Sequence, residues 1–250
     1  MKRKGRKADE LRPIRLWRGW ADFAEGSCLI EQGGTRVLCT ASVERRLPDF
    51  LREKKQGWIT AEYAMLPRAT RERNPRDSSR SRPDKRSVEI SRLIGRSLRA
   101  AVVLENLPDI CITIDCDVLR ADGGTRCAAI TGGMVAMADA LRWLEERGMI
   151  TQPPLRYLVA AVSVGIVAGE PRLDLCYEED YQAEADLNVV MTADGRFVEI
   201  QGTAERSPFT LRQFETLRRL AASGIRSLIN LQRRTLEWRR TRKNKAISAR

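Results

Sequence analysis

Two glycines, a hydroxyl and a guanidinium follow one another at Gly123, Gly124, Thr125 and Arg126, between a strand-like apolar run and a helical pattern over 127–144. Glycine lets the backbone turn its N–H groups toward one point, and a helix N-terminus adds partial positive charge there. Thr125 can donate a hydrogen bond, and Arg126 can bind two oxygens of a tetrahedral anion. The segment therefore predicts a phosphate-binding site. The alternative is a strand-to-helix turn that needs glycine only for its geometry.

Carboxylates are concentrated in a second segment. Asp174, Asp180 and Asp186 are spaced six residues apart, with Glu178 and Glu179 between the first two. Two acids that point at one spot repel each other unless a hard cation lies between them, and Mg²⁺ binds one or two carboxylates together with substrate oxygens. Such an ion would polarise a phosphoryl oxygen. The alternative is an acidic strand and turn on the surface of a basic protein.

The segment 67–86 has the most unusual composition of the chain. It holds three prolines, a cluster of serines and eight basic residues against three acidic ones. A basic arm of this kind indicates contact with nucleic acid, because each guanidinium can displace a counterion from a phosphate. The alternative is a solvated loop. The arginines that we expect to bind RNA are Arg68, Arg71, Arg73, Arg76, Arg80 and Arg82.

Together these parts indicate a reaction class, the attack of inorganic phosphate on a phosphodiester. No base is needed for that step, since phosphate is already anionic near neutral pH, and the chain contains no histidine. The absence of histidine excludes Ser-His and Cys-His nucleophiles and all histidine-ligated metals. Catalysis would depend on positioning and charge neutralisation. A P-loop nucleotide enzyme is excluded because its glycine-lysine string is missing.

The amino-acid composition is typical of a globular protein that binds a polyanion. The chain has 250 residues and a net charge of +12, which favours nucleic acid as a partner. Its six cysteines form no C-x-x-C pair, so we expect a reducing cytoplasm without disulfides or structural zinc. The apolar run 158–168 is far shorter than the roughly 20 residues of a membrane helix, and we expect no membrane association.

Secondary-structure patterns predict an α+β chain in two halves. In the first half, 1–152, we expect strands near 11–20 and 58–66, a hairpin over 28–41 and helices over 87–104 and 127–146. Ser87 is the expected N-cap of the first helix, and it places Arg86 at the beginning of that helix.

In the second half, 153–236, we expect strands over 157–167 and 173–177 and a hairpin over 186–201. The acidic segment would then be a strand, a turn and a strand. A helix over 210–233, interrupted near Gly224, would follow, and 237–250 would be a frayed basic tail.

Long strings of the sequence resemble the ribonuclease PH family. They are residues 57–70, 89–100 and 115–126 in the first half, and 173–180, 186–192 and 199–205 in the second. The match runs from about residue 10 to residue 235. The resemblance implies the fold of that family, with two βαβ-type halves, mixed sheets and packed helices, and a ring-shaped homohexamer built as a trimer of dimers.

The activity that the resemblance implies is phosphate-dependent 3′→5′ exoribonuclease activity on tRNA precursors and other 3′-hydroxyl RNA. Such an enzyme releases nucleoside diphosphates and also runs in reverse as a nucleotidyltransferase. Inorganic phosphate is the co-substrate and Mg²⁺, or Mn²⁺, the cofactor. The alternative is a non-catalytic RNA-binding ring subunit of the same fold.

On the family pattern, the phosphate site falls on Arg86, Gly124, Thr125 and Arg126. The catalytic, metal-binding carboxylates fall on Asp180 and Asp186, with Asp174 in a supporting role, and the arm 68–82 would grip RNA. Two departures lie near these positions: Tyr181 stands where a small residue is common, and Arg206 replaces a glycine.

Overall fold

The computed structural model describes residues 3, 5–48, 56–76 and 84–247, with side chains as far as residue 236. Arg80 and Arg82 of the predicted RNA-binding arm lie outside the described residues. Five strands form the first sheet: β1 (Ile14–Arg18), β2 (Gly26–Gln32), β3 (Thr35–Glu44), β4 (Trp58–Met65) and β5 (Cys111–Arg120). Their order is β1-β2-β3-β5-β4, and only the pair β4–β5 is parallel.

Helix α1 (Lys85–Arg99) crosses from β4 to the parallel strand β5, and a short 3-10 helix (Leu104–Asn106) follows it. Its buried stripe includes Ile90, Leu93, Ile94 and Leu98, as the periodicity predicts. The expected N-cap was wrong by three residues. Asp84 caps the helix because its carboxylate accepts a hydrogen bond from the Ser87 N–H at 3.1 Å.

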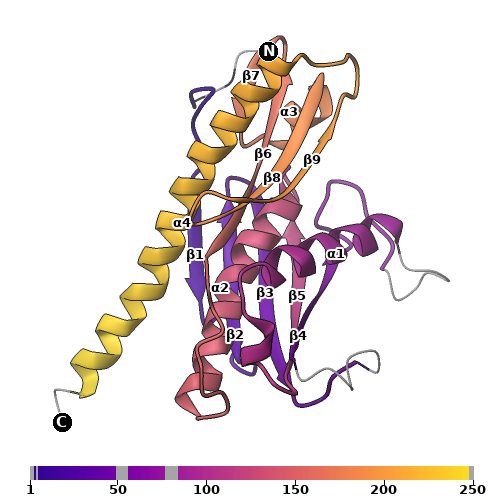
Figure 1. Cartoon of the computed structure of the whole chain (residues 1–250). Coiled ribbons are helices and arrows are strands. Elements are labelled where there is room, and N and C mark those ends of the chain that lie inside the picture. Colours follow the sequence, from indigo (N-terminus) through magenta and orange to yellow (C-terminus); the bar gives the residue numbers. More distant parts are fainter. Residues whose placement is uncertain (1–2, 4, 49–55, 77–83, 248–250) are drawn as a thin grey trace.

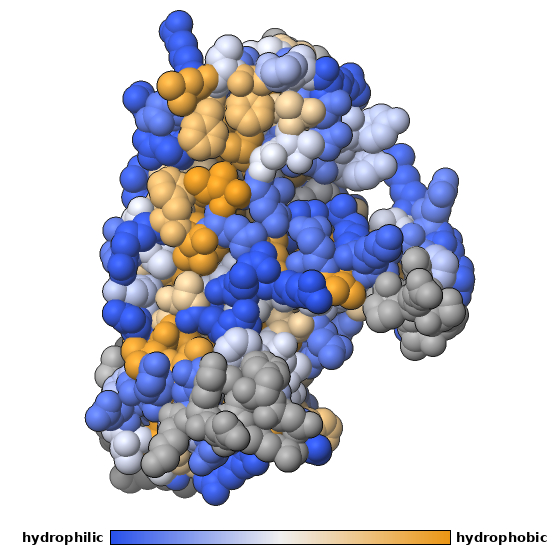
Figure 2. Space-filling view, turned by 45° about the vertical axis from the view of Figure 1, so that its right-hand side comes forward, coloured by the Kyte–Doolittle hydropathy of each residue, from blue (hydrophilic) through white to orange (hydrophobic). Residues whose placement is uncertain are grey.

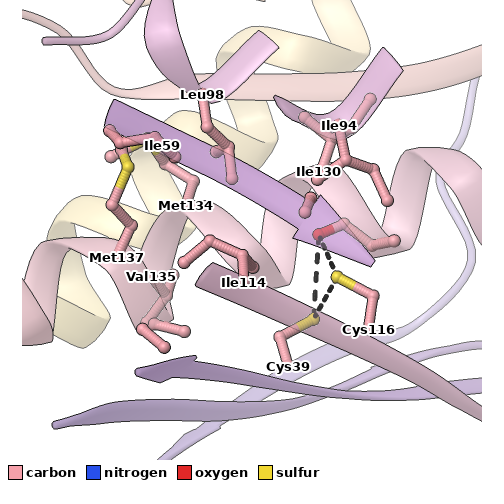
Figure 3. Packing of buried hydrophobic residues seen from close by; sticks show 14 of the residues in the cluster. Cys39, Ile59, Ile94, Leu98, Ile114, Cys116, Ile130, Met134, Val135 and Met137 are labelled. Atoms are coloured by element: carbon pink, nitrogen blue, oxygen red, sulfur yellow. Dashed lines mark hydrogen bonds between the residues drawn. The ribbon is translucent and has the colours of Figure 1, made fainter. Parts of the chain in front are cut away.

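Helix α2 (Thr125–Glu146) lies between the two sheets and is buried along most of its length (Figure 1). Small residues allow this close packing: a Cβ on Gly132 would lie 2.8 Å from Cγ2 of Ile30. Cys39 and Cys116 direct their thiols at the Ala129 carbonyl of the helix (Figure 3). The helix therefore connects the two halves through one hydrophobic core.

The second sheet consists of β6 (Val159–Val167), β7 (Glu170–Leu173), β8 (Ala185–Thr192) and β9 (Phe197–Thr203), in the order β7-β6-β8-β9. All its described pairs are antiparallel, so the expectation of a mixed sheet holds only for the first half. Strand β6 is buried throughout because both faces are covered. Ala161 belongs to the core around α2, whereas Ala160 belongs to the core beneath the last helix, α4.

The acidic segment differs from its prediction as two strands joined by a turn. Strand β7 ends at Leu173, Asp174 adopts a left-handed backbone with φ 55°, and a helix, α3 (Tyr177–Gln182), follows. Glu179 stabilises the beginning of α3, because its carboxylate accepts the Cys176 N–H at 3.2 Å. Asp180 therefore lies on a helix.

Helix α4 (Leu211–Ile247) runs without a break along one side of the molecule (Figure 1). The expectation of an interruption at Gly224 was wrong, because the helix continues through that residue. The expectation of a frayed basic tail over 237–250 stays a prediction. Gly224 lets α4 pack closely on β7, since a Cβ there would lie 2.8 Å from Cδ1 of Leu173. No helix in the described part of the chain is long and apolar enough to cross a membrane. The predicted α+β class is confirmed.

Candidate functional site

The predicted phosphate-binding segment forms the junction between β5 and α2. Gly123 and Gly124 have φ of 74° and 67°, a conformation that strains residues with side chains, and Thr125 and Arg126 begin the helix. A Cβ on Gly123 would lie 2.6 Å from the Leu175 carbonyl oxygen. The glycine loop thus packs directly against the segment that leads into α3. This contact brings the predicted phosphate-binding residues close to α3.

Tyr63 of β4 supports the first turn of α2, although no local pattern in the sequence marks it. Its hydroxyl lies 2.8 Å from Oγ1 of Thr125, in a buried position. Burial raises the pKa of Tyr63, while the hydrogen bond with Thr125 and the positive charges of Arg86 and Arg126 oppose the rise. The positive charges of both arginines of the predicted phosphate site therefore oppose the rise in the pKa of the same buried hydroxyl.

The two predicted catalytic acids come from different elements. Asp180 lies on α3, and Asp186 lies at the beginning of β8, where it pairs with Gly165 of β6 and Thr203 of β9. The pKa of Asp186 is raised to about 6, first by burial and then by the negative charges of Asp180 and Glu205, while Arg126 opposes the rise. Two carboxylates thus share one region.

Asp180 also interacts with the phosphate-binding arginines. Its pKa is raised because desolvation of the carboxyl outweighs the opposing attraction of Arg86 and Arg126. These charges come from the beginnings of α1 and α2, in the first half of the chain. The structure therefore brings together the two groups of residues that the sequence places far apart.

Arg126 is oriented by two side chains from different elements. Its Nη1 donates to Oε1 of Gln201 on β9 at 3.0 Å and to Oε1 of Glu89 on α1 at 3.5 Å. Gln201 is a further residue that sequence patterns did not mark. These contacts hold the guanidinium beside the first turn of α2, where it can bind an anion together with backbone N–H groups.

Asp174 has a different environment from the other two acids. It is fully buried, and its carboxylate accepts hydrogen bonds from Arg12 Nη2 at 2.6 Å, the Arg12 backbone N–H at 2.7 Å and Gln32 Nε2 at 2.8 Å. Arg12 also donates to the carbonyls of Asp122 and Gly123. Asp174 thus holds the glycine loop through Arg12, and its oxygens are not open to a cation.

Asp180 and Asp186 fit a divalent cation. Within the described part of the chain, no lysine or arginine makes an ion pair with either carboxylate, and their mutual repulsion contributes to the raised pKa of Asp186. A cation between them would relieve that repulsion. No group of three or more potential ligands occurs among the described residues, so substrate oxygens and water would complete the coordination.

The described part of the basic arm begins beside this site. Ala69 is buried, and its carbonyl accepts the Ala121 N–H at 2.8 Å, which anchors the arm to the end of β5. The side chains beyond this anchor are exposed at Arg71, Arg73 and Arg76, and Arg68 before it is exposed as well. The role of these arginines in RNA binding stays a prediction.

Comparison with known proteins places the chain in a family. Residues 10–142 match the model of domain 1 of the 3′ exoribonuclease (RNase PH) family, and residues 157–224 match the model of domain 2. The chain belongs to this family, and the resemblance inferred from the sequence strings is confirmed.

Solved structures with the same fold include the rice (Oryza sativa) protein Rrp46, with 19% identity and a TM-score of 0.75 over 93% of this chain and 98% of that one. An Archaeoglobus fulgidus exosome with RNA bound to the active site has 22% identity and a TM-score of 0.76, over 90% and 89% of the two chains. An archaeal exosome core has 22% identity and a TM-score of 0.74, over 92% and 90%. These likenesses confirm the predicted fold.

Proposed function

We propose that this chain is a phosphate-dependent 3′→5′ exoribonuclease that shortens RNA and releases nucleoside diphosphates. One observation carries the proposal: Arg126, at the beginning of α2, donates a hydrogen bond to Gln201 of β9, the strand whose Thr203 pairs with Asp186. The charge of Arg126 accordingly opposes the rise in the pKa of both Asp180 and Asp186, and that of Arg86 opposes the rise for Asp180. Anion-binding and cation-binding groups thus meet at one place, as the transfer of a phosphoryl group requires.

In this reaction Arg126, Arg86 and the backbone N–H groups after Gly124 bind inorganic phosphate and orient one oxygen toward the last phosphodiester. That oxygen bonds to the phosphorus while the bond to the 3′ oxygen of the preceding nucleotide breaks. The phosphate proton passes to the leaving 3′ oxygen, so the products are a nucleoside diphosphate and an RNA with a new 3′-hydroxyl. Mg²⁺, held by Asp180 and Asp186, would supply positive charge to the phosphoryl oxygens.

RNA would approach over basic surface. One side of α1 has a hollow of about 420 Å³, which is lined by Lys85, Val88, Glu89, Arg92 and Arg96. Glu89 in this hollow forms an ion pair with Arg126, so the hollow adjoins the predicted phosphate site. Figure 2 shows hydrophilic surface across the middle of this side of the molecule. The positive charges of Lys85 and Arg92 in this hollow would attract the phosphates of a single strand without regard to sequence. We propose precursor tRNA as one such substrate and a homohexameric ring as the assembly.

The alternative predicted from the sequence is an RNA-binding ring subunit without catalysis. Two of the similar structures are those of exosomes, and this likeness favours the alternative over tRNA trimming. The arginines and carboxylates described above favour catalysis over binding alone, since RNA binding does not need two carboxylates that repel each other.

Incubation of short 3′-hydroxyl RNA with Mg²⁺, with and without phosphate, distinguishes these functions. We expect nucleoside diphosphates only when phosphate is present. Nucleoside monophosphates without phosphate would mean hydrolysis by the same acids. RNA that is bound but never shortened would support the ring subunit, provided that the Asp180→Asn variant binds it equally well.

A further inference from the structure

Two exposed tyrosines lie side by side on α3. Tyr177 is 58% exposed and Tyr181 is 74% exposed, and their ring centroids lie 6.3 Å apart with 27° between the ring planes. Their spacing of four residues places both rings on one side of the helix. The pair offers aromatic faces to any flat group that approaches from solvent.

The position of this pair relative to the candidate site is fixed. Asp180 lies on the same short helix, three residues after Tyr177 and next to Tyr181. The Tyr177 backbone N–H donates to Oδ1 of Asp122 at 3.4 Å, so the beginning of α3 is tied to the glycine loop. The rings therefore project from the same short helix that carries Asp180, and the beginning of that helix is joined to the glycine loop.

A positively charged side chain, that of Arg206, lies next to the tyrosine pair. Arg206 donates from Nη2 to the Tyr181 carbonyl at 3.4 Å, and its backbone N–H donates to the Glu184 carbonyl at 3.1 Å. Tyr181 and Arg206 are the two departures from the family pattern noted near the predicted site residues, and the structure shows them in contact. An exposed arginine that contacts the backbone of Tyr181 suits the binding of bases joined by phosphates.

We propose that Tyr177 and Tyr181 form a stacking platform for the unpaired bases at the 3′ end of RNA, with Arg206 against the adjacent backbone. This inference rests on the proposed function and assigns the substrate contacts of the same site. Stacking on aromatic rings accepts every base, so the platform would hold the 3′ end near Asp180 without selecting sequence. It would favour single-stranded ends over paired ones.

The test measures binding of a ten-nucleotide RNA to the full-length chain without phosphate, so that turnover plays no part. We expect Tyr181→Ala to weaken binding roughly tenfold, within the range for the loss of one stacked base. Tyr181→Phe is the matched control, because it keeps the ring, and it should bind like the unmodified chain. A 2-aminopurine at the 3′ end should lose fluorescence on binding to the unmodified chain and to Tyr181→Phe, but not to Tyr181→Ala.

An RNA with abasic residues at its 3′ end provides the second control. If the platform stacks on bases, this RNA should bind the unmodified chain and Tyr181→Ala equally weakly. A tenfold difference that persists on abasic RNA, or equal binding of intact RNA by both proteins, would overturn the proposal. So would a change in molecular mass of the Tyr181→Ala protein, which would assign the rings to an interface between copies. Base-dependent binding without phosphorolysis would refute the proposed function and leave the platform standing.

Discussion

Arg12 and Asp174 form a buried ion pair that joins the amino-terminal segment to the second half of the chain, with Nη2 and Oδ1 2.6 Å apart. Both side chains are almost fully buried, and the same guanidinium donates to the carbonyls of Asp122 and Gly123. The glycine loop and the segment that leads into α3 are therefore held by one pair of charges. The position of the predicted phosphate-binding segment relative to Asp180 therefore depends on this ion pair.

Asp174→Asn should destabilise the protein strongly, because it removes the carboxylate 2.6 Å from the buried Arg12 and leaves only the more distant and more exposed Asp122, at 3.9 Å. Removing one partner of a buried pair costs about 3–5 kcal/mol. We expect the melting temperature to fall by roughly 10 °C or more. Asp194→Asn is the control, since it breaks an exposed pair with Arg196, and it should change the melting temperature little. Equal melting temperatures for the Asp174→Asn protein and the unmodified chain would show that the pair does not hold the halves together.

Asp186→Asn should stabilise the protein above pH 6 but not near pH 4. The folded pKa of Asp186, about 6, lies above the ordinary value of 3.8, so the folded state binds this proton more tightly than the unfolded chain. Its ionisation therefore opposes folding as pH rises from about 4 to 6, and the full penalty remains at higher pH. We expect a gain of about 1 kcal/mol at pH 7.5 after allowing for solvent screening. Thermal unfolding in EDTA at both pH values measures it, and an equal effect at both would contradict this pKa.

Mg²⁺ should raise the melting temperature of the unmodified chain at pH 7.5. A ligand that binds only the folded state stabilises it in proportion to the logarithm of its concentration. The variant Asp180→Asn plus Asp186→Asn should lose this response, whereas Asp194→Asn should keep it. A response that survives in the double variant would place the cation elsewhere.

Arg71→Ala plus Arg73→Ala should weaken RNA binding and make it less dependent on salt. Both side chains are exposed on the described part of the arm. Loss of two contacts with a single strand should reduce the slope of log affinity against log salt by about 1.4. Arg212→Ala plus Arg226→Ala removes two exposed charges of α4 instead. If both pairs change the slope equally, the arm contributes only to net charge.

Local patterns predicted those parts of the site that depend on neighbours in the chain. Gly124, Thr125 and Arg126 were recognised because a strand, two glycines and a helix follow one another. The role of Asp174 was not predictable in this way, since its partner Arg12 lies 162 residues away. Tyr63 and Gln201 were missed for the same reason.

The acidic segment shows a different limit of sequence patterns. The spacing of its three aspartates marked candidate ligands, but the segment is too short for helical periodicity to appear. Helix α3 is set by the capping contact between Glu179 and the Cys176 N–H, and by the ion pairs of Glu179 with Arg3 and Arg6. Those arginines lie at the other end of the chain, so only the folded structure shows that Asp180 is on a helix.

The central claim is that inorganic phosphate bound by Arg126 becomes part of the released nucleotide. Radiolabelled phosphate incubated with unlabelled RNA, Mg²⁺ and the full chain measures this directly. We predict that the label appears in nucleoside diphosphates, and that Arg126→Ala and Asp180→Asn each reduce its incorporation by at least 100-fold, on the order of the loss of one stabilising group. Shortening of the RNA while all of the label stays in free phosphate would contradict the account.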